Sequence, residues 1–254
     1  MSVVLSLRGV GVDYGHDSGR GTPALADVDL TVRAGERVAL VGPSGAGKST
    51  LLALCTGFVQ PTHGDVEVLG ARLAGIREGE LAALRSRIGT VHQRLELVQR
   101  LRVVHNVNAG HLGRWSTWQA LTSLVRPRDV EVARAALSRV GIADKVSART
   151  DRLSGGEQQR VALARVLVQD PDLVLADEPV SSLDPARADD VMRLLCETVA
   201  TPSRTLVVSL HDFELAVRRC DRVVGLRAGR VEFDLPAAEV DHGLRDRLYF
   251  LDRS

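Results

Sequence analysis

The amino-acid sequence predicts an α/β fold built on a parallel sheet. In the C-terminal half, short apolar runs alternate with segments of helical periodicity, as in parallel strands joined by crossover helices. Near the N-terminus, residues 3–8 and 25–32 instead alternate apolar and polar side chains, which is typical of half-buried antiparallel strands. We therefore expect an α/β core that carries an antiparallel β subdomain.

The first half of the chain is expected to hold short strands and two helices. Residues 15–21 form a glycine-rich loop between the first two strands. The elements that follow are expected at 38–41 (strand), 48–56 (helix), 66–68 (strand), 78–84 (helix) and 88–91 (strand).

Residues 95–148 lack strand patterns, and Val130, Ala133, Leu137 and Val140 recur at helical spacing. We interpret this stretch as a helical insertion. The only two tryptophans of the chain, 115 and 118, lie here three residues apart and would share one helix face. Packing within the helices is slightly favoured over contact with a partner as their role.

The second half is expected to return to alternating helices and strands. These are a helix from 154, a strand at 173–176, a helix at 186–200, a strand at 206–209, a helix at 213–219, a hairpin of 222–226 with 230–233, and a helical tail from 236. We interpret the chain as a single domain over 1–254. Its parts would be a core (1–93 and 154–235), a helical subdomain (94–153) and a C-terminal helix (236–254).

The composition is that of an ordinary globular protein, with 44% apolar and 26% charged residues among 254. Because 33 basic residues face 32 acidic ones, nothing in the charge favours a nucleic-acid partner. The three cysteines, Cys55, Cys196 and Cys220, are far apart and lack metal-ligand spacing. No secretory signal and no apolar stretch long enough to span a membrane is visible, so a membrane role would act through a partner.

A glycine-rich turn between the third strand and its helix matches the pattern G-x-x-x-x-G-K-[ST]. Backbone N–H groups of such a turn wrap a phosphate, and the helix N-terminus adds a positive field. Lysine in this pattern reaches the β- and γ-phosphates, and the hydroxyl after it ligates Mg²⁺. The candidate nucleotide contacts are Gly42, Pro43, Ser44, Gly45, Ala46, Gly47, Lys48, Ser49 and Thr50.

The apolar strand at 173–176 ends in two acids, Asp177 and Glu178. At a strand end the chain can turn and bring both carboxylates to one pocket. Asp177 would support Mg²⁺, and Glu178 would orient or deprotonate an attacking water. A solvated acidic turn before Pro179 is the alternative, and the phosphate loop upstream makes it the weaker one.

The segment Leu-Ser-Gly-Gly-Glu at 153–157 has two interpretations. Ser154 and Glu157 have the spacing of a capping box, which explains them as a helix start. Gly155 and Gly156 are not needed for a cap, and they would expose backbone donors at a helix N-terminus as an anion site. Physical reasoning alone favours the simple cap.

The order of these motifs resembles that of ABC transporter ATPase subunits. The phosphate loop, LSGGE-Q-Q-R, LVLADEP, SSLD and a late Ser-Leu-His-Asp follow one another here, and the match covers nearly the whole chain. The resemblance implies a homodimer in which each ATP lies between one phosphate loop and the partner's LSGG helix. It would place Ser154, Gly155, Gly156 and Glu157 on the γ-phosphate across the interface, with Glu157 where the family more often has Gln.

The same resemblance assigns four further residues. Gln93 falls at the Q-loop glutamine, which senses Mg²⁺ and the attacking water, and His211 at the switch histidine that contacts the γ-phosphate. Asp184 matches the D-loop, and Tyr14 matches the aromatic residue that stacks on adenine. The implied cofactors are ATP and Mg²⁺, with Mg²⁺ held by Ser49, Gln93 and Asp177.

The segment 106–124 looks like that of phosphonate-import ATPases, in which A-G-x-L-G-R is followed by S-T-W. The family has an acidic residue where this chain has His105. The resemblance implies a Mg²⁺-dependent ATPase on the cytoplasmic face of the membrane, bound to permease subunits and served indirectly by a substrate-binding protein. The alternatives are an ABC subunit for amino acids, lipids or lipoproteins, a soluble ABC ATPase, and a small-molecule P-loop kinase.

Overall fold

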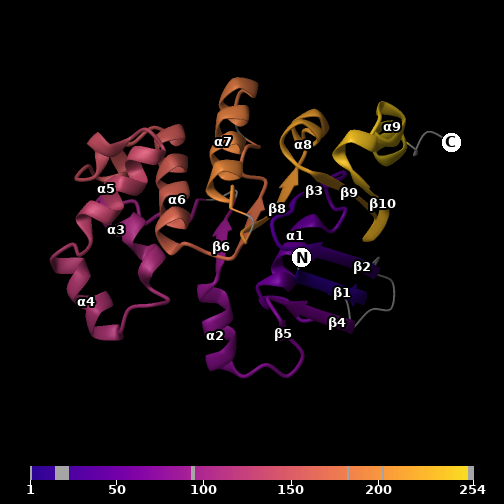
Figure 1. Ribbon diagram of the computed structural model, residues 1–254, viewed down its shortest axis with the longest axis horizontal. Helices are drawn as coiled ribbons and strands as arrows, with labels where there is room; N and C mark the ends of the chain where they lie inside the picture. The colour runs from indigo at the N-terminus through magenta and orange to yellow at the C-terminus, as the bar shows by residue number, and fades with distance from the viewer. Residues whose placement is uncertain (1, 15–22, 93–94, 182, 202, 251–254) are drawn as a thin grey trace.

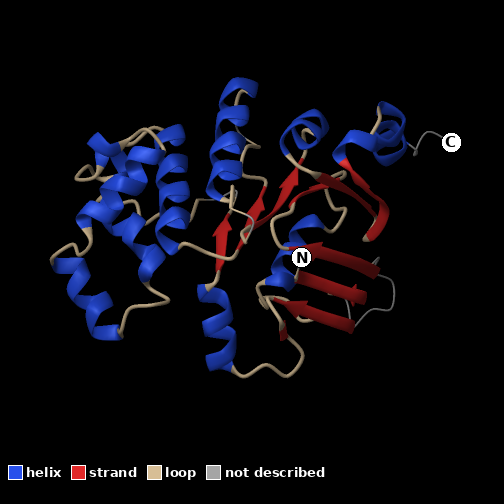
Figure 2. Cartoon of the chain, in the orientation of Figure 1, coloured by secondary structure: helices blue, strands red, loops and turns tan. Residues whose placement is uncertain are grey.

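The computed structural model describes residues 2–250 apart from 15–22, 93–94, 182 and 202. Its elements form a six-stranded sheet, a four-stranded sheet and a group of helices at one end of the molecule (Figure 1). Figure 2 shows the helices and strands in separate colours. Among the described residues no helix is both long and apolar enough to cross a membrane.

The larger sheet has the order β10-β9-β3-β8-β7-β6. The four pairings from β9 to β6 are parallel, while β10 pairs antiparallel with β9. The strands are β3 (Arg37–Val41), β6 (Ile88–Val91), β7 (Leu173–Asp177), β8 (Thr205–Leu210), β9 (Arg222–Arg227) and β10 (Arg230–Pro236). The inner strands are continuous apolar runs because helices and a second sheet cover both of their faces.

The smaller sheet is antiparallel, in the order β2-β1-β4-β5. It consists of β1 (Val3–Val12), β2 (Leu25–Arg33), β4 (His63–Val68) and β5 (Ala71–Arg72). Helix α1 (Lys48–Cys55) lies between the two sheets, where Leu51 and Leu54 are fully buried. One hydrophobic cluster joins α1 to β1, β2 and β4 on one side and to β3, β7 and β8 on the other.

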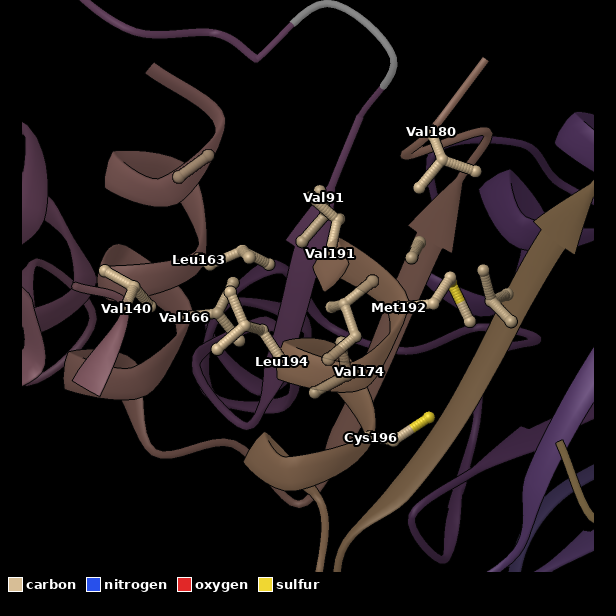
Figure 3. Close-up of a cluster of buried hydrophobic side chains, with 14 of the residues drawn as sticks. Val91, Val140, Leu163, Val166, Val174, Val180, Val191, Met192, Leu194 and Cys196 are labelled. Carbon is tan, nitrogen blue, oxygen red and sulfur yellow. The ribbon is translucent and has the colours of Figure 1, made fainter. Parts of the chain in front are cut away.

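The opposite face of the six-stranded sheet is covered by α6 (Gly155–Gln169), α7 (Pro185–Thr198) and α8 (Phe213–Arg219). Figure 3 shows part of the cluster beneath them, where Val166, Val191 and Met192 pack over Val91 and Val174 of the sheet. This packing fixes the starts of α6 and α7 relative to the strand ends.

The stretch predicted as a helical insertion is helical. It contains α3 (Val103–Asn108), α4 (Thr117–Val125) and α5 (Val130–Arg139), with a short 3₁₀ turn directly after α3 and two more after α5. The predicted periodic residues of α5 face inward, since Ala133 and Leu137 are fully buried. Helix α2 (Glu78–Ser86) lies outside this group and leads into β6.

The two tryptophans do not share a helix face, because Trp115 precedes α4, whose N-cap is Ser116. Trp115 is half-buried and stacks on His111 with ring centroids 5.3 Å apart, so packing accounts for it. Trp118 is 74% exposed, which contradicts the favoured interpretation of packing for this residue.

The C-terminal tail differs from the prediction of a helix from 236. Strand β10 continues to Pro236, a 3₁₀ turn covers 237–239, and only then does helix α9 (His242–Phe250) begin. Proline donates no hydrogen bond to a ladder and is tolerated on an edge strand such as β10. Strand β5 was also not predicted, since two residues are too few to show a period.

Candidate functional site

The candidate catalytic residues meet at the carboxyl edge of the six-stranded sheet. In the ladder, Val41 of β3 pairs with Leu210 of β8, and Asp177 of β7 pairs with Ser209 of β8. The residues that follow each strand therefore start from adjacent positions. This is the edge at which open α/β sheets bind ligands.

The phosphate loop connects β3 to α1 and depends on glycine at two crowded positions. Gly42 has φ +150° and Gly47 has φ +102°. A Cβ on Gly42 would lie 2.0 Å from the Leu226 carbonyl oxygen, and one on Gly47 would lie 2.5 Å from that of Ala24. Any larger residue would push the loop away from β9 and β2. The close backbone approach is therefore why the sequence pattern requires glycine here.

The phosphate loop encloses a cavity of about 320 Å³, lined by Ala24, residues 44–50 and Glu178. Its size is within the range of small-ligand sites. All of the predicted loop residues from Ser44 to Thr50 line this cavity, and Ser49 is exposed to it at the start of α1. These seven residues therefore share one concave surface, and their role in binding nucleotide remains a prediction.

Lys48 is held at the loop by its own backbone. Its Nζ donates to the carbonyl oxygens of Gly42, at 2.8 Å, and Pro43, at 3.1 Å. Burial lowers the pKa of Lys48, while Glu178 and Asp177 act in the opposite direction. The ammonium is therefore partly desolvated, so an anionic phosphate in the cavity would be strongly attracted.

The two acids after β7 point to one region because the chain turns sharply between them. Glu178 has φ +46°, the left-handed conformation that non-glycine residues rarely adopt. The fully buried Ser209 supports this turn, since its hydroxyl donates to Asp177 Oδ1 at 2.6 Å and accepts from the Glu178 N–H at 2.9 Å. Both carboxylates are therefore close enough to raise the pKa of the Lys48 ammonium.

His211 directly follows β8 and contacts the second of these acids. Its Nε2 lies 2.5 Å from Oε1 of Glu178. The candidate base and the candidate switch histidine are thus in hydrogen-bond contact beside the phosphate cavity. Such a pair is what proton transfer from a water molecule requires.

Tyr14 lies where an adenine-stacking residue could act. Its hydroxyl donates to Thr50 Oγ1 at 3.4 Å, and 68% of its surface is exposed. The ring therefore borders the phosphate loop and remains open to a planar ligand. The glycine-rich loop at 15–21 lies outside the described residues.

The segment 154–157 does not reach the phosphate cavity within the chain. Ser154 caps α6, with Glu157 N donating to its Oγ at 3.3 Å and Ser154 N donating to Glu157 Oε2 at 2.8 Å. The predicted capping box is therefore present. The residues from Ser154 to Glu157 line a different cavity, of about 490 Å³, which touches Glu178 from the other side. Gly155 and Gly156 have no atom within 4 Å of a Cβ position, so packing does not demand them.

Asp184 is the N-cap of α7 and accepts a hydrogen bond from Arg187 N at 3.1 Å. Gln93, predicted as a ligand of Mg²⁺ and a sensor of water, lies outside the described residues. Two residues at the site were not assigned from the sequence. Ser209 supports both acids, and Tyr249 Oη accepts from the N–H of Gly42 at 3.1 Å. A serine near a strand end is a weak signal, and Tyr249 is too distant in sequence to give one.

The fold and this edge of the sheet define the class as P-loop NTPases. The sequence pattern of the ABC transporter family matches residues 25–181. The chain therefore belongs to the ABC transporter family, and it is an ATP-binding ATPase subunit of that family.

Curated relatives share this sequence over most of its length. A Phosphonates import ATP-binding protein PhnC 1 from Pseudomonas syringae pv. tomato is 47% identical over 96% of this chain and 92% of that protein. A PhnC 2 from Pseudomonas aeruginosa is 49% identical over 96% and 91%. The PhnC of Anaeromyxobacter dehalogenans is 53% identical over 95% of this chain, which spans only 47% of that longer protein.

Solved structures show the same fold. The dimeric structure of MJ0796, a bacterial ABC transporter cassette, has a TM-score of 0.79 and 30% identity, covering 92% of this chain and 99% of that chain. The structure of cbiO1 from Clostridium perfringens, part of the ABC transporter complex cbiONQ, has a TM-score of 0.79 and 27% identity, covering 94% and 90%. These comparisons confirm the predicted fold class.

Proposed function

We propose that this chain is the ATP-hydrolysing subunit of an importer for phosphonates or a related phosphorus compound. The observation that carries the substrate class is its 44–53% identity, over at least 90% of its length, to phosphonates import ATP-binding proteins. The ATPase half of the proposal is supported by the phosphate loop, the two acids and His211 at one sheet edge.

Mg²⁺ fits the donors at this edge. Among the described residues no group of three metal-binding side chains comes together. Mg²⁺ in nucleotide sites commonly takes one or two protein ligands and completes its shell with phosphate oxygens and water. Ser49 and Asp177 supply the hard oxygen donors that it prefers and would hold it, with Gln93 as the predicted third ligand. When bound, the ion neutralises charge on the β- and γ-phosphates.

This chain's own residues then perform the hydrolysis. The N–H groups of the phosphate loop and the ammonium of Lys48 hold the β- and γ-phosphates. Glu178 orients a water molecule and takes its proton as the water oxygen bonds to the γ-phosphorus and the bond to ADP breaks. His211 contacts Glu178 at 2.5 Å and would link this base to the γ-phosphate.

A second copy of the chain completes the site. Residues 154–157 line a cavity separate from the phosphate cavity, so their exposed glycine amides have no phosphate to bind within one chain. The dimeric arrangement of the MJ0796 cassette supports a homodimer in which these residues face the partner's ATP. ATP binding would close the dimer, and hydrolysis would open it.

The permease is the proposed membrane partner, and it would hold the chain at the cytoplasmic face. Helix α4 presents an exposed apolar face, formed by Trp118, Leu121 and Leu124, that is unusual on a protein without a partner. We expect Trp118→Glu to reduce co-purification with the permease. Thr117→Glu, an exposed neighbour, is the matched control. Equal recovery of the permease with both variants would remove α4 from this interface.

Growth tests the substrate class. Cells lacking this chain are supplied with the wild type or with Glu178→Gln, with a phosphonate, phosphite or phosphate as the sole source of phosphorus. The proposal predicts rescue by the wild type alone, and only on the reduced phosphorus sources. Growth of the deleted cells on a phosphonate, in a strain with no second importer, would contradict it and favour another substrate.

A further inference from the structure

Tyr249 connects the C-terminal helix to two parts of the catalytic edge. Its Oη accepts a hydrogen bond from the N–H of Gly42 at 3.1 Å, and it donates to the carbonyl oxygen of His211 through a longer contact of 3.5 Å. Tyr249 belongs to α9, more than 200 residues after the phosphate loop. The hydroxyl therefore joins the phosphate loop to the residue that contacts Glu178.

These two contacts lie directly beyond the last rung of a parallel ladder. Val41 of β3 and Leu210 of β8 are the last paired residues, and Gly42 and His211 are the next residue on each strand. Here the strands separate, since one enters the phosphate loop and the other the segment before α8. The hydroxyl occupies the position of one more rung, because it accepts from one strand and donates to the other.

The rung sets a spacing that matters to the chemistry. The carbonyl group of Gly42 holds Nζ of Lys48 at 2.8 Å. The imidazole of His211 lies 2.5 Å from Glu178. Through Gly42 the hydroxyl thus positions Lys48, which would hold the phosphate. Through His211 it positions the residue that contacts the base, Glu178. A shift of about 1 Å between them is large on the scale that hydrolysis tolerates.

Helix α9 is docked firmly enough to act as a fixed support. Leu248 is 2% exposed within the main hydrophobic cluster, and Tyr249 packs against the same cluster. The carbonyl oxygen of Arg247 accepts from Arg227 Nη1 at 3.1 Å. Burial raises the pKa of the Tyr249 phenol, which keeps its proton in place for donation near neutral pH.

We propose that Tyr249 is a positioning residue for ATP hydrolysis, whose hydroxyl sets the distance between the phosphate loop and His211. This inference rests on the ATPase activity and on the role proposed for His211. It gives the C-terminal helix a function in the site that neither the motifs nor the comparisons assign.

Tyr249→Phe tests the proposal because it removes one oxygen and keeps the ring. We expect kcat for ATP to fall by about three- to tenfold, with KM within twofold, since the phosphate contacts themselves remain. The melting temperature should change by no more than about 2 °C. Leu248→Ala is the structural comparator: it loosens the helix that holds the hydroxyl, so both its melting temperature and its kcat should fall. A loss of kcat in Tyr249→Phe at an unchanged melting temperature is what a positioning role predicts.

A double-mutant cycle separates positioning from a general structural role. In single-turnover hydrolysis of γ-labelled ATP, Tyr249→Phe should cost less than about 1.5-fold once His211→Ala is present, because the residue it positions is gone. The same loss in both backgrounds would overturn the proposal, as would a wild-type kcat in Tyr249→Phe. A wild-type chain that shows no ATP turnover would refute the ATPase assignment itself. That outcome is distinct from failure of the positioning role, in which the wild type still hydrolyses ATP.

Discussion

Glu178→Gln is the substitution whose effect the site geometry defines best. Glutamine has nearly the same size and can occupy the same left-handed turn, where the backbone N–H of residue 178 still donates to Ser209 Oγ. The amide can still contact His211. What is lost is the ability to accept a proton from water, so the change isolates the chemical step from the architecture of the edge.

The magnitude follows from the role of a general base. Such groups contribute about 10²- to 10⁴-fold to rate, or roughly 3–5 kcal/mol at about 1.4 kcal/mol for each factor of ten. ATP affinity should change little, because the phosphate loop and Lys48 make the phosphate contacts and remain intact. Removing the charge of Glu178 also removes an interaction that raises the pKa of Lys48, while Asp177 continues to act in that direction.

The assay pairs phosphate release with equilibrium binding of a fluorescent ATP analogue. We expect kcat to fall at least 100-fold while the dissociation constant stays within about threefold. A kcat within threefold of the wild type would refute Glu178 as the base. A parallel loss of binding would instead show that this carboxylate shapes the phosphate cavity.

The remaining predictions concern neighbouring features of the site and core. Lys48→Ala should weaken ATP binding at least tenfold, and unchanged affinity would remove its role. Ser154→Arg should leave ATP binding intact and abolish hydrolysis, because the nucleotide on the partner loses its contact with residues 154–157; normal turnover would contradict the composite site. Ser209→Ala should destabilise the chain by about 1 kcal/mol, seen as a lower melting temperature, because it removes the acceptor of the half-buried Glu178 N–H and the donor to Asp177. Burial raises the pKa of Cys55 to about 12, so its thiol should resist alkylation at pH 8 in the folded chain. Because the pKa is raised by folding, the folding free energy linked to this thiol is present below the usual thiol pKa and is lost as pH rises above it. Rapid alkylation at pH 8 would show that the core around Cys55 is open.

Most of the fold could be predicted because its elements are locally encoded. The buried strands are visible in the sequence as apolar runs. The phosphate loop is visible as a glycine pattern, because it needs glycine where the backbone of β9 and the start of β2 come close. The bounds of α9 and the short β5 could not be predicted, since Pro236 ends an edge strand and two residues show no period. Trp118 misled because an apolar residue at helical spacing does not reveal whether its face is covered.

The candidate site was predictable only where a motif carried it. Lys48, the pair Asp177 and Glu178, and His211 come from three separate segments, and the sheet register brings them to one edge. The supporting contact from Tyr249 depends on how α9 packs against β9 and brings its hydroxyl to Gly42, which no local pattern records. The roles of Gln93, Asp184 and the segment 154–157 remain predictions, because they require nucleotide or a second copy.

The most direct test of the composite site is complementation between two inactive variants. A Lys48→Ala subunit keeps an intact segment 154–157, and a Ser154→Arg subunit keeps an intact phosphate loop. Mixed in equal amounts with ATP, their heterodimers would each contain one complete site. The account predicts hydrolysis well above either variant alone, up to about a quarter of the wild-type rate, since half of the dimers are mixed and one of their two sites is complete. A rate equal to the mean of the two separate variants would contradict it.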